Sequence, residues 1–169
     1  TCALPICVAK LLLENGADVN AVDEYKRTAL HDAAWEGYVN VAKVLIQNGA
    51  DVNAVDKWRQ RTALHLAAME GHADVVKVLL QNVADVNAVT DRKNTALHYA
   101  AVGGHVDVVK VLIQNGADVN AVGRFKRSTL HITGWKGHAD VAKVLLQNGA
   151  DVNAVDNCKC TTLHYATEK

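Results

Sequence analysis

Apolar and polar positions along this chain follow one pattern, which returns at intervals of 33 or 34 residues. In one copy, a short apolar stretch from Ala63 to Ala68 follows Thr62 and closes at Gly71-His72. A threonine hydroxyl can accept hydrogen bonds from the free amides of a first helical turn, and glycine suits the left-handed residue after a helix. A second apolar stretch spans about Asp74 to Gln81, with its stripe at Val75, Val78 and Leu79. Each copy therefore predicts two short helices followed by a polar hairpin.

Two sequence markers identify the copies. The first is "NGADVNAV", which begins at Asn15, Asn48, Asn115 and Asn148, with the variant "NVADVNAV" at Asn82. The second is T-x-L-H or S-x-L-H, which begins at Thr28, Thr62, Thr95, Ser128 and Thr161. The one longer interval comes from an inserted residue within Asp56–Arg61.

A helix pair this small cannot bury its own apolar stripe, so neighbouring copies must stack and share a core. The predicted fold is all-α, a solenoid of stacked helix-turn-helix units with hairpin loops. We expect a single domain over residues 1–169, with repeats at about 23–55, 56–89, 90–122 and 123–155, and partial repeats at 1–22 and 156–169. The partial repeats leave apolar faces uncovered, which predicts a piece of a longer array or end-to-end self-association.

The period, T-x-L-H, the Gly-His turn and "VVKVLIQNGADVNA", which begins at Val108, together resemble the ankyrin repeat over essentially the whole chain. The resemblance implies that the T-x-L-H histidines bond the capping threonine and a neighbouring turn. It also implies a non-enzymatic protein-protein interaction module or scaffold that holds a partner on a concave face. A designed library member and a recently duplicated natural array, as in bacterial ankyrin proteins, would both show so uniform a frame. The insertion, Val83 and the cysteines favour a natural or naturally derived one.

The chain departs from the family at the hairpin glycine and at one helix-closing glycine. Lys26, Gln60, Lys93, Lys126 and Lys159 occupy the hairpin position, and Val83 occupies the other. A non-glycine residue in a left-handed turn costs about 1 kcal/mol. We therefore expect less tightly turned hairpins and a weak junction near Val83.

Positions that differ between copies gather at the hairpin tips and late in the first helix, and these hold the large aromatic residues. In the ankyrin family such positions line the partner-binding face. Tryptophan, tyrosine and arginine also dominate binding energy at protein interfaces. The predicted partner-binding residues are Tyr25, Arg27, Trp35, Trp58, Arg61, Met69, Arg92, Asn94, Tyr99, Val102, Arg124, Phe125, Arg127, Trp135 and Lys136. The alternative is that these large side chains belong to the core.

Charge is segregated although the chain is neutral, with 18 basic and 18 acidic residues. The five tips (23–27, 56–61, 90–94, 123–127 and 156–160) hold 11 of the basic and five of the acidic residues, so they carry +6 and the remainder −6. A basic rim favours an acidic protein or peptide partner. The alternative function is binding of nucleic acid or another polyanion, with bases stacked on Tyr25, Trp58 and Phe125. Exposed turns also favour lysine and arginine for solubility alone.

Candidate chemistry adds no enzymatic interpretation. The single serine, Ser128, opens a helix, and eight histidines recur with the repeats, whereas an active site is needed once. We expect no catalytic residue, cofactor or metal, since Cys158, Cys160 and His164 match no common zinc spacing. Cysteines confined to the two ends and the lack of a signal or membrane segment predict an intracellular, cytoplasmic protein without a membrane partner.

Overall fold

In the computed structural model, which describes residues 4–167, both predicted helices form in each of the four full repeats, while the two partial repeats contain one helix each. Those residues form ten α-helices and one short 3-10 helix, and they fall into two compact units that meet in the chain at Asp85 and Val86. The N-terminal unit contains α1 (Leu4–Glu14), α2 (Ala29–Glu36), α3 (Val39–Gln47), α4 (Ala63–Glu70) and α5 (Ala73–Gln81). The C-terminal unit contains α6 (Ala96–Gly103), α7 (Val106–Gln114), η1 (Arg124–Lys126), α8 (Thr129–Lys136), α9 (Ala139–Gln147) and α10 (Thr162–Thr167).

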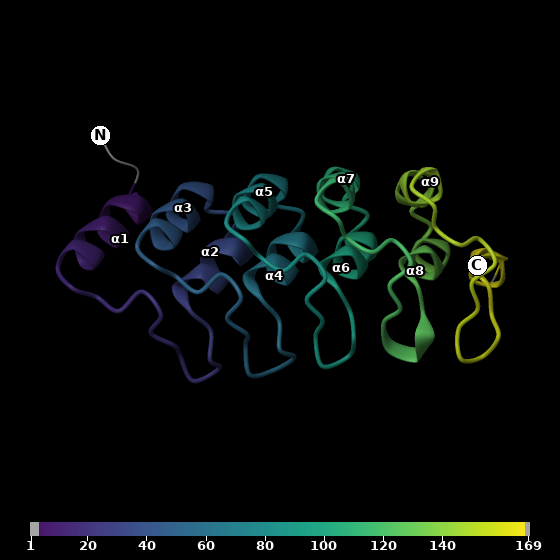
Figure 1. The fold of residues 1–169 in the computed structure, drawn as a ribbon, viewed down its shortest axis with the longest axis horizontal. Helices are drawn as coiled ribbons and strands as arrows, with labels where there is room; N and C mark the ends of the chain where they lie inside the picture. The colour runs from purple at the N-terminus through teal and green to yellow at the C-terminus, as the bar shows by residue number, and fades with distance from the viewer. Residues whose placement is uncertain (1–3, 168–169) are drawn as a thin grey trace. The chain divides into compact units, whose positions relative to one another are not determined.

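Each unit is a double row of helices with hairpins on one side (Figure 1). In the N-terminal unit α2 lies beside α4, while α1, α3 and α5 form the second row. In the C-terminal unit α6, α8 and α10 form the first row, and α7 and α9 the second. Within the described residues the only β-bridge is an isolated one between Val122 and Ser128, which lie on the two legs of one hairpin. The all-α prediction is confirmed.

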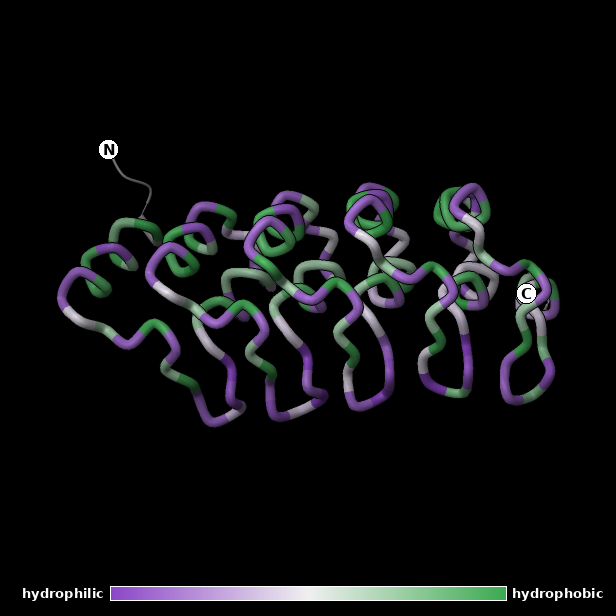
Figure 2. Tube along the Cα trace, viewed as in Figure 1, coloured by the Kyte–Doolittle hydropathy of each residue, from purple (hydrophilic) through white to green (hydrophobic). Residues whose placement is uncertain are grey.

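The core of each unit consists of the apolar residues that recur in every copy. Leu30, Leu64 and Leu79 in the N-terminal unit are at most 1% exposed, as are Leu97 and Leu112 in the C-terminal unit. Burying one such side chain contributes roughly 2 kcal/mol, and alanines between the leucines let the helices approach closely. The hairpin tips, in contrast, are largely hydrophilic (Figure 2). End-to-end self-association stays a prediction; the apolar side chains available for it are Val8, Leu11, Leu12 and Leu163.

In α2, α6 and α8 a buried histidine joins the T-x-L-H helix to the following hairpin. The backbone amide of Thr28 donates to Nδ1 of His31 at 3.1 Å, and the Thr28 hydroxyl lies 2.9 Å from the same nitrogen. Nδ1 therefore accepts, so the ring proton sits on Nε2, which donates to the carbonyl oxygen of Arg61 at 3.1 Å. His131 repeats this arrangement with Ser128 and the carbonyl of Cys160. The role that the resemblance implied for these histidines is confirmed.

The asparagines of four "DVN" segments also join neighbouring repeats: Asn20, Asn53, Asn87 and Asn120. Asn20 donates from its side chain to the carbonyl of Gly49 at 3.0 Å and accepts from the amide of Asp51 at 2.8 Å. Asn120 bonds Gly149 and Asp151 in the same way, at 3.1 and 2.9 Å. Each asparagine thus satisfies a donor and an acceptor of the next loop, which fixes the register of stacking.

Each hairpin tip turns tightly at a residue in the left-handed conformation, although this residue is a lysine or a glutamine and not a glycine. Lys26, Gln60, Lys93, Lys126 and Lys159 have φ between 55° and 60°. The turn bonds remain short, for example 3.0 Å from the amide of Lys26 to the carbonyl of Asp23. The expectation of looser hairpins was therefore wrong, because the chain accepts backbone strain instead of opening the turn. Val83 is likewise left-handed, with φ 59°.

We predict that acid weakens the histidine junction. Burial lowers the pKa of His31, and the hydrogen bond to Arg61 and nearby carboxylates offset only part of this effect. His31 therefore binds a proton more readily in the unfolded chain than in the folded one. The stability that neutral His31 provides is full above the unfolded-state pKa and decreases as the pH falls from there towards the lower folded-state pKa. Urea denaturation should show a lower free energy of unfolding at about pH 5.5 than at about pH 7.5. His31→Asn should lose less stability over the same interval; an equal loss in both proteins would contradict this assignment.

We also predict that Val83→Gly stabilises the protein by about 1 kcal/mol, because it removes left-handed strain at a β-branched residue. The Val83 side chain is 84% exposed, so little packing is lost. Gly116 is the reciprocal control: its φ is +88° and an added Cβ would meet nothing within 4 Å. Gly116→Val should therefore destabilise by a similar amount in denaturant titrations. A decrease on Val83→Gly would show that its side chain makes a stabilising contact.

Candidate functional site

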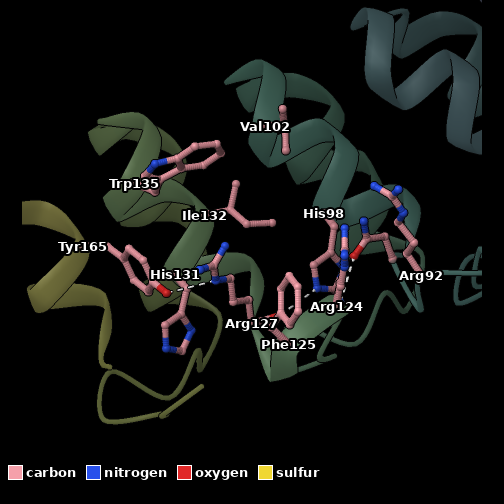
Figure 3. A pocket seen from close by; sticks show the side chains of 11 residues that line it. Arg92, His98, Val102, Arg124, Phe125, Arg127, His131, Ile132, Trp135 and Tyr165 are labelled. Carbon is pink, nitrogen blue, oxygen red and sulfur yellow. Dashed lines mark hydrogen bonds between the residues drawn. The ribbon is translucent and has the colours of Figure 1, made fainter. Parts of the chain in front are cut away.

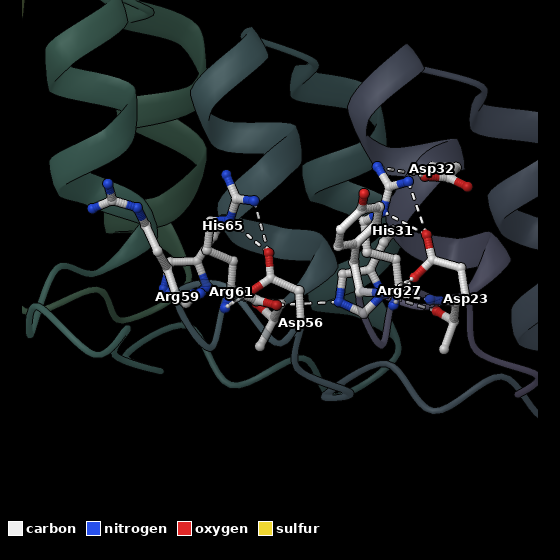
Figure 4. Close-up of polar contacts among 11 residues, drawn as sticks. Asp23, Arg27, His31, Asp32, Asp56, Arg59, Arg61 and His65 are labelled. Carbon is white, nitrogen blue, oxygen red and sulfur yellow. Dashed lines mark hydrogen bonds and ion pairs between the residues drawn. The ribbon is translucent and has the colours of Figure 1, made fainter.

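The tips of the N-terminal unit are built around an aspartate (Figure 4). One oxygen of Asp23 accepts from the amides of Tyr25 and Arg27 at 2.8 Å, and the other accepts from Nε of Arg27 at 3.0 Å. Asp56 accepts from the amides of Arg59 and Arg61 at 3.0 Å and forms a 2.7 Å ion pair with Arg61. The first residue of the tip thus organises both the turn and the arginine that closes it.

Burial distinguishes the two carboxylates. The Asp56 side chain is fully buried, whereas that of Asp23 is 36% exposed. Burial raises the pKa of Asp56, but the amides of Arg61 and Arg59 and the Arg61 guanidinium outweigh it, and the pKa is lowered overall. Asp56 is therefore a structural anion that is neutralised within its own tip.

Two tips of the C-terminal unit begin without an aspartate. Thr90 and Gly123 occupy the position of Asp23 and Asp56. Thr90 closes its tip through its hydroxyl, which bonds the backbone of Asn94. Asp156 does keep the organising role, and it accepts from the Tyr165 hydroxyl at 2.6 Å and lies 3.6 Å from Nε of Arg127.

The aromatic side chains of the N-terminal unit form two exposed features. Tyr25 and Trp58, on neighbouring tips, have ring centroids 5.7 Å apart, and Trp58 is 66% exposed. Trp35, near the end of α2, lines a hollow of about 290 Å³. The other side chains lining this hollow are Arg27, Asp32, Glu36, Arg61 and Leu66.

The C-terminal unit has a pocket of about 270 Å³ between its tips and its first-row helices (Figure 3). Its lining consists of Arg92, Asn94, His98, Val102, Arg124, Phe125, Arg127, His131, Ile132, Trp135 and Tyr165. The guanidinium of Arg124 lies 4.4 Å from the Phe125 ring centroid, and that of Arg127 lies 5.7 Å from it. Both distances are typical of cation-π contacts. The pocket is therefore apolar on its helical side and cationic at its tips.

Comparison with known families matches nearly the whole chain. A family model described as ankyrin repeats in three copies matches residues 48–123. A second, described as ankyrin repeats in many copies, matches residues 12–67 and 112–166.

The chain belongs to the ankyrin repeat family.

Ankyrin repeats generally mediate protein-protein interaction and are typically non-enzymatic modules. The comparison with individually curated proteins gives no match. Within residues 4–167 no group of three or more histidine, cysteine or acidic side chains could hold a metal ion. No helix in the same part of the chain is long and apolar enough to cross a membrane. Cys7 is disulfide-bonded, whereas Cys158 and Cys160 form no disulfide, so the cysteines are not uniformly reduced.

Most predicted partner-binding residues lie on the surface of this ankyrin protein. Trp35, Trp58 and Trp135 are 42%, 66% and 47% exposed, so the alternative that places them in the core is wrong. The pocket of the C-terminal unit brings together seven of the predicted residues: Arg92, Asn94, Val102, Arg124, Phe125, Arg127 and Trp135. Lys136 lies over the Trp135 ring, 4.4 Å from its centroid. Met69 and Tyr99 are half-buried on α4 and α6 and line neither this pocket nor the Trp35 hollow.

Sequence reasoning missed the residue that follows each T-x-L-H histidine. Ile132 and Tyr165 at this position line the pocket of the C-terminal unit, while Asp32 and Leu66 line the hollow beside Trp35. The position varies from copy to copy as the tips do, but only Tyr99 was singled out there. That variation is the signal that could have found the others.

The predicted basic rim is partly neutralised within this ankyrin fold. Arg27, Arg61 and Arg127 each form an ion pair with an aspartate at the start of a tip. Among the described side chains, Arg92 and Arg124 have no such ion pair within 4.0 Å. The unpaired tip arginines of the pocket therefore belong to the two tips that lack the aspartate.

We predict that Asp56→Asn destabilises the protein by about 3 kcal/mol, because it leaves Arg61 without its buried counter-charge. Asp23→Asn is the matched control, with the same bonds in an exposed tip, and should cause a much smaller loss. Urea denaturation of both variants measures the difference. Equal losses would show that the turn bonds, rather than burial of the ion pair, determine the cost.

Proposed function

We propose that this ankyrin protein binds a protein partner through its hairpin tips and the exposed ends of its first-row helices. The observation that carries the proposal is the exposure of all three tryptophans, at positions that vary between otherwise uniform repeats. An exposed tryptophan gains little from folding, whereas its burial against a partner removes a large apolar surface from water. The repeats thus combine a uniform frame with aromatic side chains available for contact.

The surfaces of the two units differ in kind. In the N-terminal unit the Tyr25–Trp58 pair and Trp35 present aromatic area beside arginines that are already ion-paired. In the C-terminal unit Phe125 and Trp135 border a pocket. Binding hot spots consist of such aromatic anchors together with arginine, surrounded by contacts of small individual effect.

Binding of nucleic acid is the weaker proposal. Phosphate recognition requires a run of available cations, and three of the tip arginines are held by aspartates in the structure. Acidic side chains also remain exposed beside the tips, among them Glu24 and Asp91. A protein partner does not require a continuous run of cations.

The proposal predicts that replacing Trp35, Trp58 and Trp135 together by alanine weakens partner binding by about thirtyfold or more. Immobilised full-length chain would be used to capture proteins from cell extract, followed by quantitative mass spectrometry and by titration of each captured protein. Tyr38→Ala is the control, because Tyr38 is 48% exposed but lies outside the tips and the first-row helices. Proteins that bind both wild type and the triple variant equally would contradict the proposal.

A further inference from the structure

The pocket of the C-terminal unit has a charge pattern that its counterpart in the N-terminal unit lacks. Arg92, Arg124 and Arg127 line it, and no acidic side chain does. In the hollow beside Trp35, Asp32 and Glu36 face Arg27 and Arg61, both of which are ion-paired. Corresponding positions of the same repeat frame thus give a surface of paired charges in one unit and a cationic surface with two unpaired arginines, Arg92 and Arg124, among the described residues of the other.

We infer that this pocket, defined by Phe125, Trp135 and the three arginines, binds an extended acidic peptide segment through one bulky apolar side chain. This inference rests on the proposed function and names the chemistry of the partner. The apolar side chain enters the space between Phe125, Ile132 and Trp135. Aspartate or glutamate side chains next to it in the peptide pair with Arg92 and Arg124.

The size of the pocket favours a single side chain over a small organic ligand. Its volume of about 270 Å³ lies below the range of roughly 300–1,000 Å³ that is typical of small-molecule sites. One large aliphatic or aromatic group therefore fills it, and the rest of the ligand must lie outside. The apolar wall at Val102, Ile132 and Trp135 suits such a group.

A second hollow provides the path for the rest of an extended chain. It has a volume of about 540 Å³, lies between the tips 90–94 and 123–127, and shares Arg92, Arg124 and Phe125 with the pocket. Lys93 and Lys126 also line it, against a single acid, Asp91. A peptide that leaves the pocket through this hollow therefore passes further cations, which favours acidic residues on that side.

The available charge lies on the arginines that other contacts leave free. Nε of Arg127 is engaged by Tyr165 at 3.0 Å and lies 3.6 Å from Asp156, so this side chain mainly forms a wall. The Arg124 guanidinium lies 4.4 Å from the Phe125 ring centroid and forms no ion pair among the described residues, so its N–H groups can bind a carboxylate. Arg92 has no ion pair among the described residues. Two arginines can therefore pair with carboxylates without losing an internal partner.

The aromatic wall of the pocket stands on a strained backbone. Phe125 has φ 61° and ψ 25°, and Lys126 beside it has φ 60°, whereas the other four tips have a single left-handed residue each. The carbonyl of Phe125 accepts from the amide of Asn157 at 3.0 Å, which ties this conformation to the next tip. A bulky residue kept in a left-handed conformation is strain of the kind that clusters at binding sites. Here the left-handed conformation of Phe125 places its ring beside Arg124.

Peptide selection tests the inference directly. Random peptides displayed on phage are selected on the immobilised full chain, and the enriched peptides are resynthesised with a fluorescein label for anisotropy titrations. We expect an excess of aspartate and glutamate around one leucine, isoleucine, phenylalanine or tryptophan, and affinity that falls steeply with salt. Failure to enrich any peptide, or enrichment without acidic excess, would overturn the inference.

Charge-matched variants separate the pocket from general electrostatics. Arg92→Gln combined with Arg124→Gln should weaken the selected peptides about tenfold or more. Lys110→Gln combined with Lys143→Gln removes the same charge from exposed positions on α7 and α9 and should leave affinity nearly unchanged. Equal loss in the two double variants would overturn the inference. So would a uridylate oligomer that binds more tightly than the peptides and shows the same arginine dependence.

Two glycine substitutions test the wall. Phe125→Gly should raise the melting temperature, because it relieves the left-handed strain, and should weaken the selected peptides several-fold. Lys126→Gly relieves similar strain but keeps the ring, so it should raise the melting temperature without weakening binding. Phe125→Gly that binds as well as wild type would overturn the inference.

The two proposals fail differently. If protein capture depends on the tryptophans while the selected peptides show no acidic preference, the proposed function stands and the peptide inference fails. If the triple tryptophan variant captures the same proteins as wild type, the proposed function fails, whatever the peptides show.

Discussion

Stacking of neighbouring repeats is the constraint on which the rest of this structure depends. Two helices of eight and nine residues, such as α2 and α3, have one apolar side each and no partner of their own to cover it. The leucines that recur in every copy supply the buried area. A histidine on one side and an asparagine on the other then fix how the next repeat sits, with hydrogen bonds such as His31 to Arg61 and Asn20 to Gly49. Because these positions are committed to the junctions, the tips and the ends of the first-row helices are left free to vary.

The first residue of each tip sets how that tip closes. Where it is an aspartate, as at Asp23 and Asp56, the carboxylate organises the turn and pairs with the arginine that closes it. Where it is Thr90 or Gly123, the turn closes without a carboxylate; the closing residue is then Asn94 in one tip and, in the other, Arg127, which pairs with Asp156 of the next tip. The two tips without the aspartate are also the two that flank the pocket of the C-terminal unit.

Regular features of the fold were predictable because each depends on contacts that every copy repeats. T-x-L-H, the Gly-His turn and the "DVN" asparagine appear at fixed spacing, so the helices and their caps follow from the sequence. The ion pair between Arg127 and Asp156 and the position of Tyr165 in the pocket were not predictable, because they join different copies at positions where the copies differ. The hairpins were misjudged for another reason. Propensity gives the cost of a left-handed lysine, but not whether the surrounding bonds are sufficient to impose that conformation.

The central claim is that the recurring residues build the stack while the tryptophans stay available to a partner. Acrylamide quenching of tryptophan fluorescence tests it most directly, on the free chain and again with a captured partner at saturation. The account predicts red-shifted emission and efficient quenching in the free chain, since all three indoles are at least 42% exposed, with protection when the partner binds. Blue-shifted emission that resists quenching in the free chain would place the indoles inside the stack and contradict the account.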